Sequence, residues 1–159
     1  MAVETRPGHE GIGAPMPRVG ARRLVEGRAR YCDDLDLPRQ LHACFVRSPY
    51  AHARIVSIDA AAARQAPGVA FVGAWAGLQA YCEPFLGVLH HLPGMVSAPQ
   101  WPLAREVARW QGEPVVIVVA ESRALAEDAA GLVEVEWDPL PPVVDPTQAL
   151  AEGAVTIHP

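Results

Sequence analysis

An uninterrupted apolar segment covers residues 115–120, where valine, isoleucine and alanine follow one another without a polar residue. A run of this length without alternation predicts a strand that is covered by protein on both faces. Pro114 precedes the run and fits the first position of a strand, since its missing N–H is lost only at the margin of the ladder. We expect the rest of the domain to be organised around this strand.

A helix and a further strand are predicted directly after this segment. Ser122 is a suitable N-cap residue for the helix. Leu125, Ala129 and Leu132 then recur at helical spacing, which predicts a single apolar stripe. Residues 133–137 alternate between apolar and acidic side chains, as in a strand with one face in water. This strand–helix–strand order predicts a parallel, right-handed crossover.

A smaller unit of the same kind is predicted earlier in the chain. Residues 41–47 and 54–58 have the apolar pattern of two strands. Asp59 is expected to cap a short alanine-rich helix over residues 60–65, and the turn after it leads into a strand over residues 69–72. The combined pattern predicts an α/β fold with a mixed sheet, built from strand–helix–strand units.

The remaining segments have weaker patterns. Residues 73–102 are rich in glycine and proline, which predicts a long, loop-rich excursion with a helical turn near residues 74–81. We expect a short strand or turn over residues 105–110 and a short helical piece over residues 147–152. Residues 1–17 have the composition of a flexible N-terminal arm.

Composition limits the class of protein. The chain has 159 residues, of which 50% are hydrophobic, so we expect one domain over residues 18–159. The net charge of −5 argues against nucleic acid as the main partner. No apolar run approaches the roughly 20 residues of a membrane helix, and the N-terminus has no apolar signal-peptide core. We therefore predict no membrane partner.

Cysteine and lysine usage restricts the chemistry further. Cys32, Cys44 and Cys82 are odd in number and widely spaced, which predicts reduced thiols and a cytoplasmic location. All 13 basic residues are arginines. The absence of lysine excludes a Schiff-base lysine and a phosphate-binding lysine of the Walker type within this sequence.

Two groupings could hold a metal ion or form a nucleophile. Cys82, His90 and His91 could ligate a metal with Cys32 or Cys44, but their spacing matches no zinc pattern. We favour structural roles for these side chains.

A second grouping pairs Cys44 with His42 or His52. His42 and Cys44 are two residues apart, so they project from the same face of the predicted strand. A cysteine on a regular strand is usually a core residue, and nothing nearby supplies an oxyanion hole. For His52 we favour a hydrogen-bonding role in a turn over catalysis.

Acidic and basic clusters offer no better candidates. The pairs Asp33/Asp34 and Glu127/Asp128 are adjacent in sequence and lack an apolar setting that would raise a pKa. Glu113 is predicted in a turn. Five arginines in residues 18–30 could bind phosphate or an acidic partner, although we favour a solvated segment balanced by the aspartates after it. The residues alone assign no catalytic, cofactor-binding or metal-binding side chain.

Several ordered segments resemble one known family. The first half carries GRARYCDD, LHA, VRSPYAHARI, ID and APGV; the second carries PLA, GEPV, VVAE, AEDAA and LP. From about Arg18 to His158 this set resembles the α/β hammerhead domain of the aldehyde oxidase/xanthine dehydrogenase family, in particular the large subunits of carbon monoxide dehydrogenases.

The resemblance implies a molybdenum hydroxylase. In that family the hammerhead opens the large subunit, and a following region binds the molybdenum–molybdopterin cofactor and carries the catalytic glutamate. Electrons leave through iron–sulfur clusters and usually FAD on other domains or subunits. The family's catalytic and cofactor-binding residues have no matching positions in this sequence.

We therefore predict a non-catalytic hammerhead subunit or fragment that packs on a separate molybdenum-cofactor-binding chain, together with iron–sulfur and FAD subunits. An exposed apolar patch is expected if so. Arg47, Tyr50, His52 and Trp101 are the candidate interface residues. One alternative is a stand-alone binding or scaffold module that retains the fold without activity. A small hydrolase that uses Cys44 or Cys82 is a further alternative.

Overall fold

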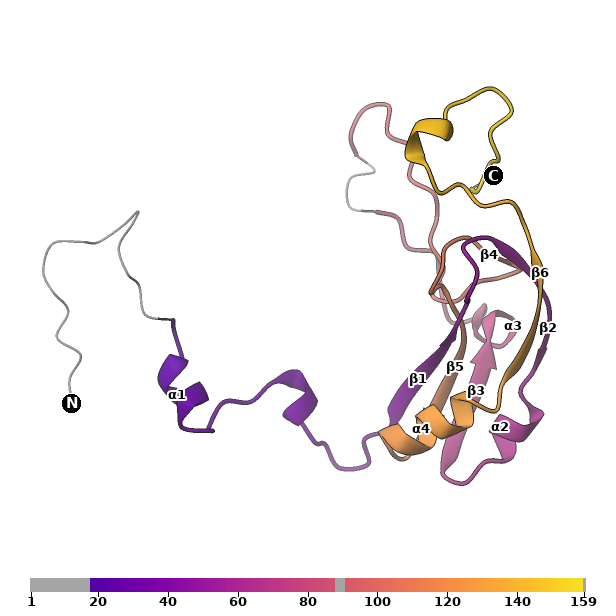
Figure 1. Ribbon diagram of the computed structural model, residues 1–159. Helices are drawn as coiled ribbons and strands as arrows, with labels where there is room; N and C mark the ends of the chain where they lie inside the picture. The colour runs from indigo at the N-terminus through magenta and orange to yellow at the C-terminus, as the bar shows by residue number, and fades with distance from the viewer. Residues whose placement is uncertain (1–17, 88–90, 159) are drawn as a thin grey trace, which may run out of the picture. The chain divides into compact units, whose positions relative to one another are not determined.

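The computed structural model describes residues 18–87 and 91–158. The chain divides into two units, residues 1–38 and residues 39–159. The described part of the first unit contains one short helix, α1 (Ala21–Val25), and a 3-10 turn, η1 (Cys32–Asp34) (Figure 1). The arm predicted over residues 1–17 lies outside the described residues.

The second unit contains two three-stranded sheets. In the first sheet, β5 (Pro114–Ala120) is the central strand. It pairs in antiparallel fashion with β1 (His42–Arg47) on one edge and with β3 (Val69–Ala74) on the other. The predicted organising strand is confirmed, because both of its edges are hydrogen-bonded and the side chains of Val115, Val116 and Val118 are fully buried.

The second sheet has β2 (Ala53–Asp59) at its centre. The two-residue strand β4 (Val107–Ala108) pairs with one edge of β2, and β6 (Glu134–Pro139) pairs with the other, both antiparallel. The short strand expected near residues 105–110 is therefore confirmed. The alternation of β6 is also as predicted, with Val135 and Trp137 half-buried and Glu134 and Glu136 exposed.

The predicted parallel crossover is wrong. The helix α4 (Arg123–Ala130) does link β5 to β6, but these two strands belong to different sheets. The physical reason is that β1 and β3 occupy both edges of β5, so β6 has no edge of that sheet to join. The α/β architecture is confirmed, with every strand pairing antiparallel. The helix α2 (Ala61–Gln65) joins the two sheets in the same way between β2 and β3.

The start of α4 is as predicted, but its buried stripe is rotated. The Ser122 hydroxyl accepts a hydrogen bond from the Leu125 N–H at 3.2 Å, as expected of an N-cap. The fully buried side chains of the helix are Ala126 and Ala129, whereas Leu125 is only half-buried. Leu132 is 47% exposed, because it lies in the turn beyond the end of the helix.

The core lies where the two sheets and the short helices meet (Figure 1). Its buried cluster consists mostly of alanine and valine, and Ile55, Ile58 and Trp137 from the second sheet pack against it. Gly68 illustrates how closely the parts approach. Its φ is +71°, and a Cβ at this position would lie 2.7 Å from Leu125 Cδ1 of α4.

Irregular chain connects β3 to β4. The predicted helical turn is present as α3 (Trp75–Leu78). Within the described part of the excursion that follows it, the only β-bridge joins Phe85 to Gln100. After β6, the expected helical piece is a 3-10 turn, η2 (Pro146–Gln148), capped by the Asp145 carboxylate. No described helix is long and apolar enough to cross a membrane.

Candidate partner-facing site

The potential metal ligands do not form a cluster in the described chain. Residues 18–87 and 91–158 contain no group of three or more His, Cys, Asp or Glu side chains placed to hold a metal ion. The three cysteines are free, with Cys32 exposed and Cys44 and Cys82 half-buried. His42 and Cys44 lie on the same half-buried face of β1, as their spacing predicts. His90, one of the candidate metal ligands, lies outside the described residues.

Three of the four candidate interface residues lie at the end of β1 or in the connection from β1 to β2. This connection is anchored by Ser48, which is buried. The Ser48 N–H donates to the Glu113 carbonyl at 2.9 Å, and the Gly112 N–H donates to the Ser48 carbonyl at 2.8 Å. The Ser48 hydroxyl donates to the Tyr50 carbonyl and accepts from the Tyr50 N–H. This double attachment fixes the turn against the residues that precede β5.

Arg47 and Tyr50 reach the surface beside this turn. The Arg47 guanidinium donates to the Gly112 carbonyl at 2.9 Å and lies 5.5 Å from the centroid of the Phe45 ring. The Tyr50 ring packs 5.9 Å from Trp137 of β6. Both side chains therefore have positions fixed by the fold while remaining exposed.

His52 belongs to the interior of the same region. It is only 8% exposed, and its Nδ1 lies 2.8 Å from the Pro141 carbonyl. Its backbone carbonyl accepts from the Leu140 N–H at 2.9 Å. These bonds hold the end of β6 to the start of β2, which is the structural role favoured from the sequence.

Glu113 is the buried carboxylate of this region, in the turn before β5. Its Oε2 accepts a hydrogen bond from the Arg109 N–H. Burial raises the pKa of the Glu113 carboxyl above its usual value of 4.5, and the nearby Arg109 charge and backbone N–H groups offset only part of this rise. The carboxyl holds the turn together from within.

The fourth candidate, Trp101, lies in a different cluster. Its ring packs edge-on against Trp75 of α3, with centroids 4.8 Å apart. The Arg105 guanidinium lies 4.8 Å from the centroid of Trp101 and 5.8 Å from that of Trp75. Trp101 is thus not part of the Ser48 turn, whose contacts are with residues 112–113 and with β6.

A pocket of about 280 Å³ opens beside this aromatic cluster. The end of the excursion, the strand β4 and the C-terminal tail form its walls. The charged or titratable lining residues are Arg105, Glu106, Arg109 and His158, and the other lining residues are Ala98, Pro99, Trp101 and Val107.

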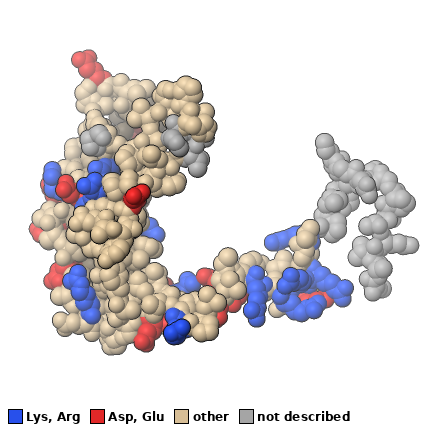
Figure 2. All heavy atoms as spheres, turned by 180° about the vertical axis from the view of Figure 1, so that it is seen from behind, with Lys and Arg blue, Asp and Glu red and all other residues tan. Residues whose placement is uncertain are grey.

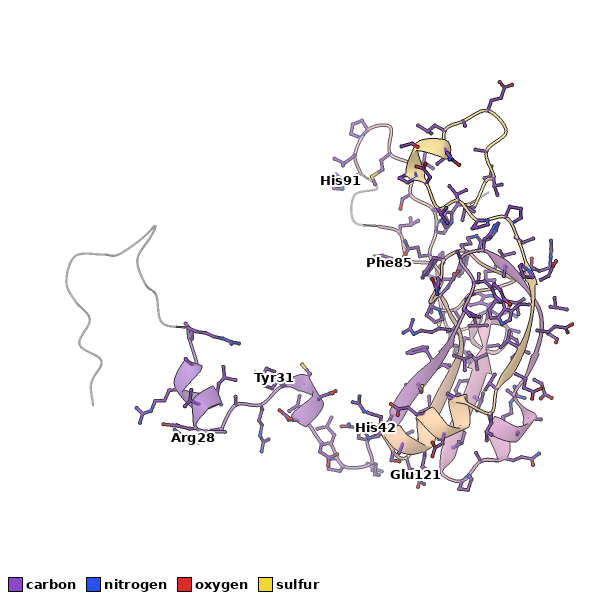
Figure 3. The ribbon with its side chains drawn as sticks, viewed as in Figure 1. Arg28, Tyr31, His42, Phe85, His91 and Glu121 are labelled. Carbon is purple, nitrogen blue, oxygen red and sulfur yellow. The ribbon has the colours of Figure 1, made fainter. Side chains whose placement is uncertain are left out.

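Large apolar side chains are exposed on the excursion and on the tail. On the excursion they are Tyr81, Phe85, Leu86, Leu92, Met95 and Val96, and on the tail they are Val144, Leu150 and Val155. Figure 1 places the two segments at the same end of the second unit, and Figure 3 shows Phe85 and His91 there. Figure 2 shows few charged atoms at this end. We call these nine residues the apolar end.

The arginine-rich segment belongs to the first unit. Figure 2 shows a dense group of basic atoms there. Glu26 pairs with Arg22 at 2.7 Å and also with Arg28, and these contacts lower the pKa of the Glu26 carboxyl. The Asp34 carboxylate, expected to balance the arginines, accepts the Tyr31 N–H at 2.8 Å.

Comparison with known families decides the identity of the fold. The family model for the aldehyde oxidase and xanthine dehydrogenase a/b hammerhead domain matches residues 26–141. The chain belongs to this family. The hammerhead is 45% identical over 144 residues to the nicotine 6-hydroxylase large subunit of Paenarthrobacter nicotinovorans, an alignment that covers 91% of the hammerhead chain and 18% of that subunit.

Solved structures agree. The hammerhead matches quinoline 2-oxidoreductase from Pseudomonas putida 86 with a TM-score of 0.81 and 43% identity, covering 90% of this chain and 18% of that one. It matches a Cu,Mo-CO dehydrogenase with a TM-score of 0.74 and 41% identity, covering 91% of this chain and 18% of that one. The chain therefore spans less than a fifth of the length of these relatives and corresponds to the hammerhead portion of their large chains.

The sequence pattern does not predict which residues line the pocket or form the apolar end. Trp75 and Trp101 are far apart in the sequence, and no local pattern indicates that Arg105 lies against both rings. The available signal was compositional, because residues 73–102 combine aromatic residues with glycine and proline in a long segment of irregular pattern.

Proposed function

We propose that this chain is the non-catalytic hammerhead part of a molybdopterin-dependent oxidoreductase, and that it packs on the region that binds the molybdenum cofactor. Membership of the hammerhead family and the share of its relatives that the chain spans support this proposal. The reaction would be the hydroxylation of a carbon centre with oxygen derived from water, or a related oxidation, carried out outside this chain.

The apolar end is the observation that carries the proposal. Val96 and Leu150 are 95% and 96% exposed, although the same chain buries valine completely in β5. An exposed apolar patch with polar surroundings is typical of a surface that another chain or domain covers. A chain that packs on a partner is expected to expose an apolar patch. The exposed apolar side chains of the excursion and the tail agree with this expectation.

The cofactors belong to the neighbouring parts of the enzyme in this proposal. Residues 18–87 and 91–158 hold no group of three or more His, Cys, Asp or Glu side chains placed to bind a metal ion, and the proposal assigns none of them to the cofactor. We assign the molybdenum–molybdopterin cofactor to the region covered by the apolar end. Iron–sulfur clusters and FAD are assigned to further domains or subunits, and the free cysteines agree with a cytoplasmic enzyme.

Co-purification tests this assignment. Residues 1–159 carrying an affinity tag are co-expressed with the molybdenum-cofactor-binding region as a separate polypeptide. The captured material is then analysed by mass spectrometry and for molybdenum. We expect a molybdenum-bearing polypeptide in stoichiometric amount. A metal-free monomer would contradict the proposal and would support the alternative of a stand-alone scaffold.

Matched variants locate the contact. Val96→Ser together with Leu150→Ser removes two almost fully exposed side chains of the apolar end, so the free chain keeps its stability. We expect the amount of captured molybdenum to fall at least tenfold. Val56→Ser alters a half-exposed valine of β2 and serves as the control, for which capture stays unchanged. Equal capture by all variants would exclude the apolar end as the contact.

A further inference from the structure

We propose that the pocket between the end of the excursion, β4 and the C-terminal tail binds a carboxylate group, held by Arg105 and Arg109 against the Trp101 ring. These residues and the others that line the pocket all lie in the described part of the second unit. The pocket volume of about 280 Å³ is close to the lower limit for small-ligand sites.

The Arg105 guanidinium is held in place by contacts with aromatic rings, and its N–H donors take no part in these contacts. The group lies over the Trp101 and Trp75 rings, so cation–π attraction holds its plane. No ion pair or hydrogen bond to this guanidinium occurs within residues 18–87 and 91–158. Its N–H groups are therefore available to a planar anion, which guanidinium binds in bidentate fashion.

Arg109 supplies a second, more deeply placed guanidinium. Its Nε donates to the Ile157 carbonyl at 3.0 Å, and its Nη1 donates to the Val107 carbonyl at 3.3 Å. Two backbone carbonyls thus orient the group and leave further N–H donors for a ligand. His158 lies on the pocket wall, and its pKa is lowered mainly by its burial and further by the Arg109 charge. The second contribution indicates a positive potential there.

The charges that line the pocket favour an anion. Eight residues line the pocket, and Glu106 is the acidic one. Its negative charge offsets the positive charge of one of the two lining arginines. Glu113 does not line the pocket, but its carboxyl accepts the Arg109 N–H and also interacts with the Arg109 charge. Trp101 and Pro99 supply apolar wall, so an aromatic or aliphatic carboxylate would bury its carbon skeleton there and pair its oxygens with the guanidinium groups.

The carboxylate could come from either of two sources. One is a free carboxylic acid, and the other is an Asp or Glu side chain of the molybdenum-cofactor-binding region. The second source rests on the proposed function, whereas binding to the pocket itself does not. The experiment therefore has one arm on this chain alone and one arm on the complex.

The first arm titrates the isotopically labelled chain with sodium benzoate at constant ionic strength, and follows the Trp indole and Arg Nε–H resonances by NMR. We expect saturable shifts at Trp101 and Arg105 with benzoate, and none with the neutral analogue benzamide. The absence of a saturable shift at about 50 mM benzoate, or an equal response to benzamide, would overturn the proposal.

Variants of the pocket sharpen this arm. Arg105→Gln removes a guanidinium that makes no hydrogen bond in the described structure, so folding is preserved while benzoate affinity falls about tenfold. Glu106→Gln removes the opposing charge, and affinity rises several-fold. Arg64→Gln changes an exposed arginine of α2 and leaves affinity within about twofold. Unchanged affinity in both pocket variants would overturn the assignment.

The second arm repeats the titration on the co-purified complex. Loss of benzoate binding, together with weaker association of the Arg105→Gln chain, would identify a side chain of the molybdenum-binding region as the ligand. Retained benzoate binding with unchanged association would identify a free carboxylic acid. If the wild-type chain does not associate at all, the proposed function fails, while the first arm still decides the carboxylate site.

Discussion

At the scale of residues, the interior is built from small apolar side chains. Among the described residues, the largest side chains that are fully buried are Leu103, Val115, Val116 and Val118. Alanines fill most of the remaining core positions. Small side chains let helices and sheets approach closely, so each lost methyl group leaves a cavity that the surroundings cannot easily fill.

Val118→Ala tests this packing directly. Val118 is fully buried at the centre of β5, and its loss of two methyl groups is expected to lower the free energy of unfolding by about 2 kcal/mol. Urea denaturation followed by circular dichroism measures the change. The same substitution at the 52% exposed Val56 of β2 is expected to cost less than about 0.5 kcal/mol. Equal effects at the two positions would contradict this account of the core.

Glu113 gives a pH-dependent prediction at the same scale. Because burial raises the pKa of Glu113 in the folded state, the folded chain holds this proton more tightly than the unfolded chain. Its contribution to stability is complete below about pH 4.5 and is lost as the pH rises through the folded-state pKa. Glu113→Gln removes this titration and keeps a carbonyl oxygen for the Arg109 N–H.

The measurement is the urea midpoint of both proteins over a series of pH values from about 4 to 8. The wild type is expected to lose stability relative to Glu113→Gln as the pH rises. The remaining carboxyl groups are common to both proteins and cancel in the difference. Parallel curves, or a wild type that gains stability with rising pH relative to the variant, would show that Glu113 is not the titrating group.

At the scale of elements, the helix α4 depends on its N-cap residue, Ser122, and on two buried alanines. It has eight residues, which is too short for stability in isolation. Ser122 satisfies the Leu125 N–H, while Ala126 and Ala129 bury their side chains. The cap and the packing therefore stabilise the helix together.

Ser122→Ala removes the side-chain cap and is expected to lower the free energy of unfolding by about 1 kcal/mol. Ser122→Asp keeps an oxygen for the Leu125 N–H and should retain most of the stability. Ser57→Ala is the matched control, because the exposed Ser57 hydroxyl bonds only the Glu136 carboxylate at the surface. Thermal unfolding of the wild type and the three variants compares them, and a Ser122→Ala chain as stable as the wild type would exclude a capping role.

At the scale of the whole molecule, all strands of both sheets belong to residues 39–159. The described elements of residues 18–38 are α1 and η1, which contain no buried residue. The second unit therefore contains every described strand and all the buried apolar residues of the described chain.

Residues 39–159 alone are expected to fold cooperatively, with a urea midpoint close to that of the full chain. Circular dichroism and urea denaturation of the two proteins test this. A fragment that lacks strand signal or unfolds without cooperativity would show that residues 1–38 are required for the core.

The local pattern predicted individual elements well. The unbroken apolar run of β5, the Ser122 cap and the alternation of β6 each appear in the structure, because burial and capping leave their mark on adjacent residues. The stripe of α4 was misjudged at Leu132, since sequence spacing could not show that the helix ends at Ala130.

The sequence by itself indicated most of the strands and helices of residues 39–159, but not α1, and the ordered family segments indicated the hammerhead fold. Only the tertiary structure decided that β5 and β6 lie in separate antiparallel sheets, because apolar patterning does not specify which strand edges form hydrogen bonds with each other. The same holds for the carboxylate pocket. Trp75, Trp101, Arg105 and Arg109 are ordinary residues along the chain, and only folding places the Arg105 guanidinium over the two rings and brings Arg109 to the same pocket.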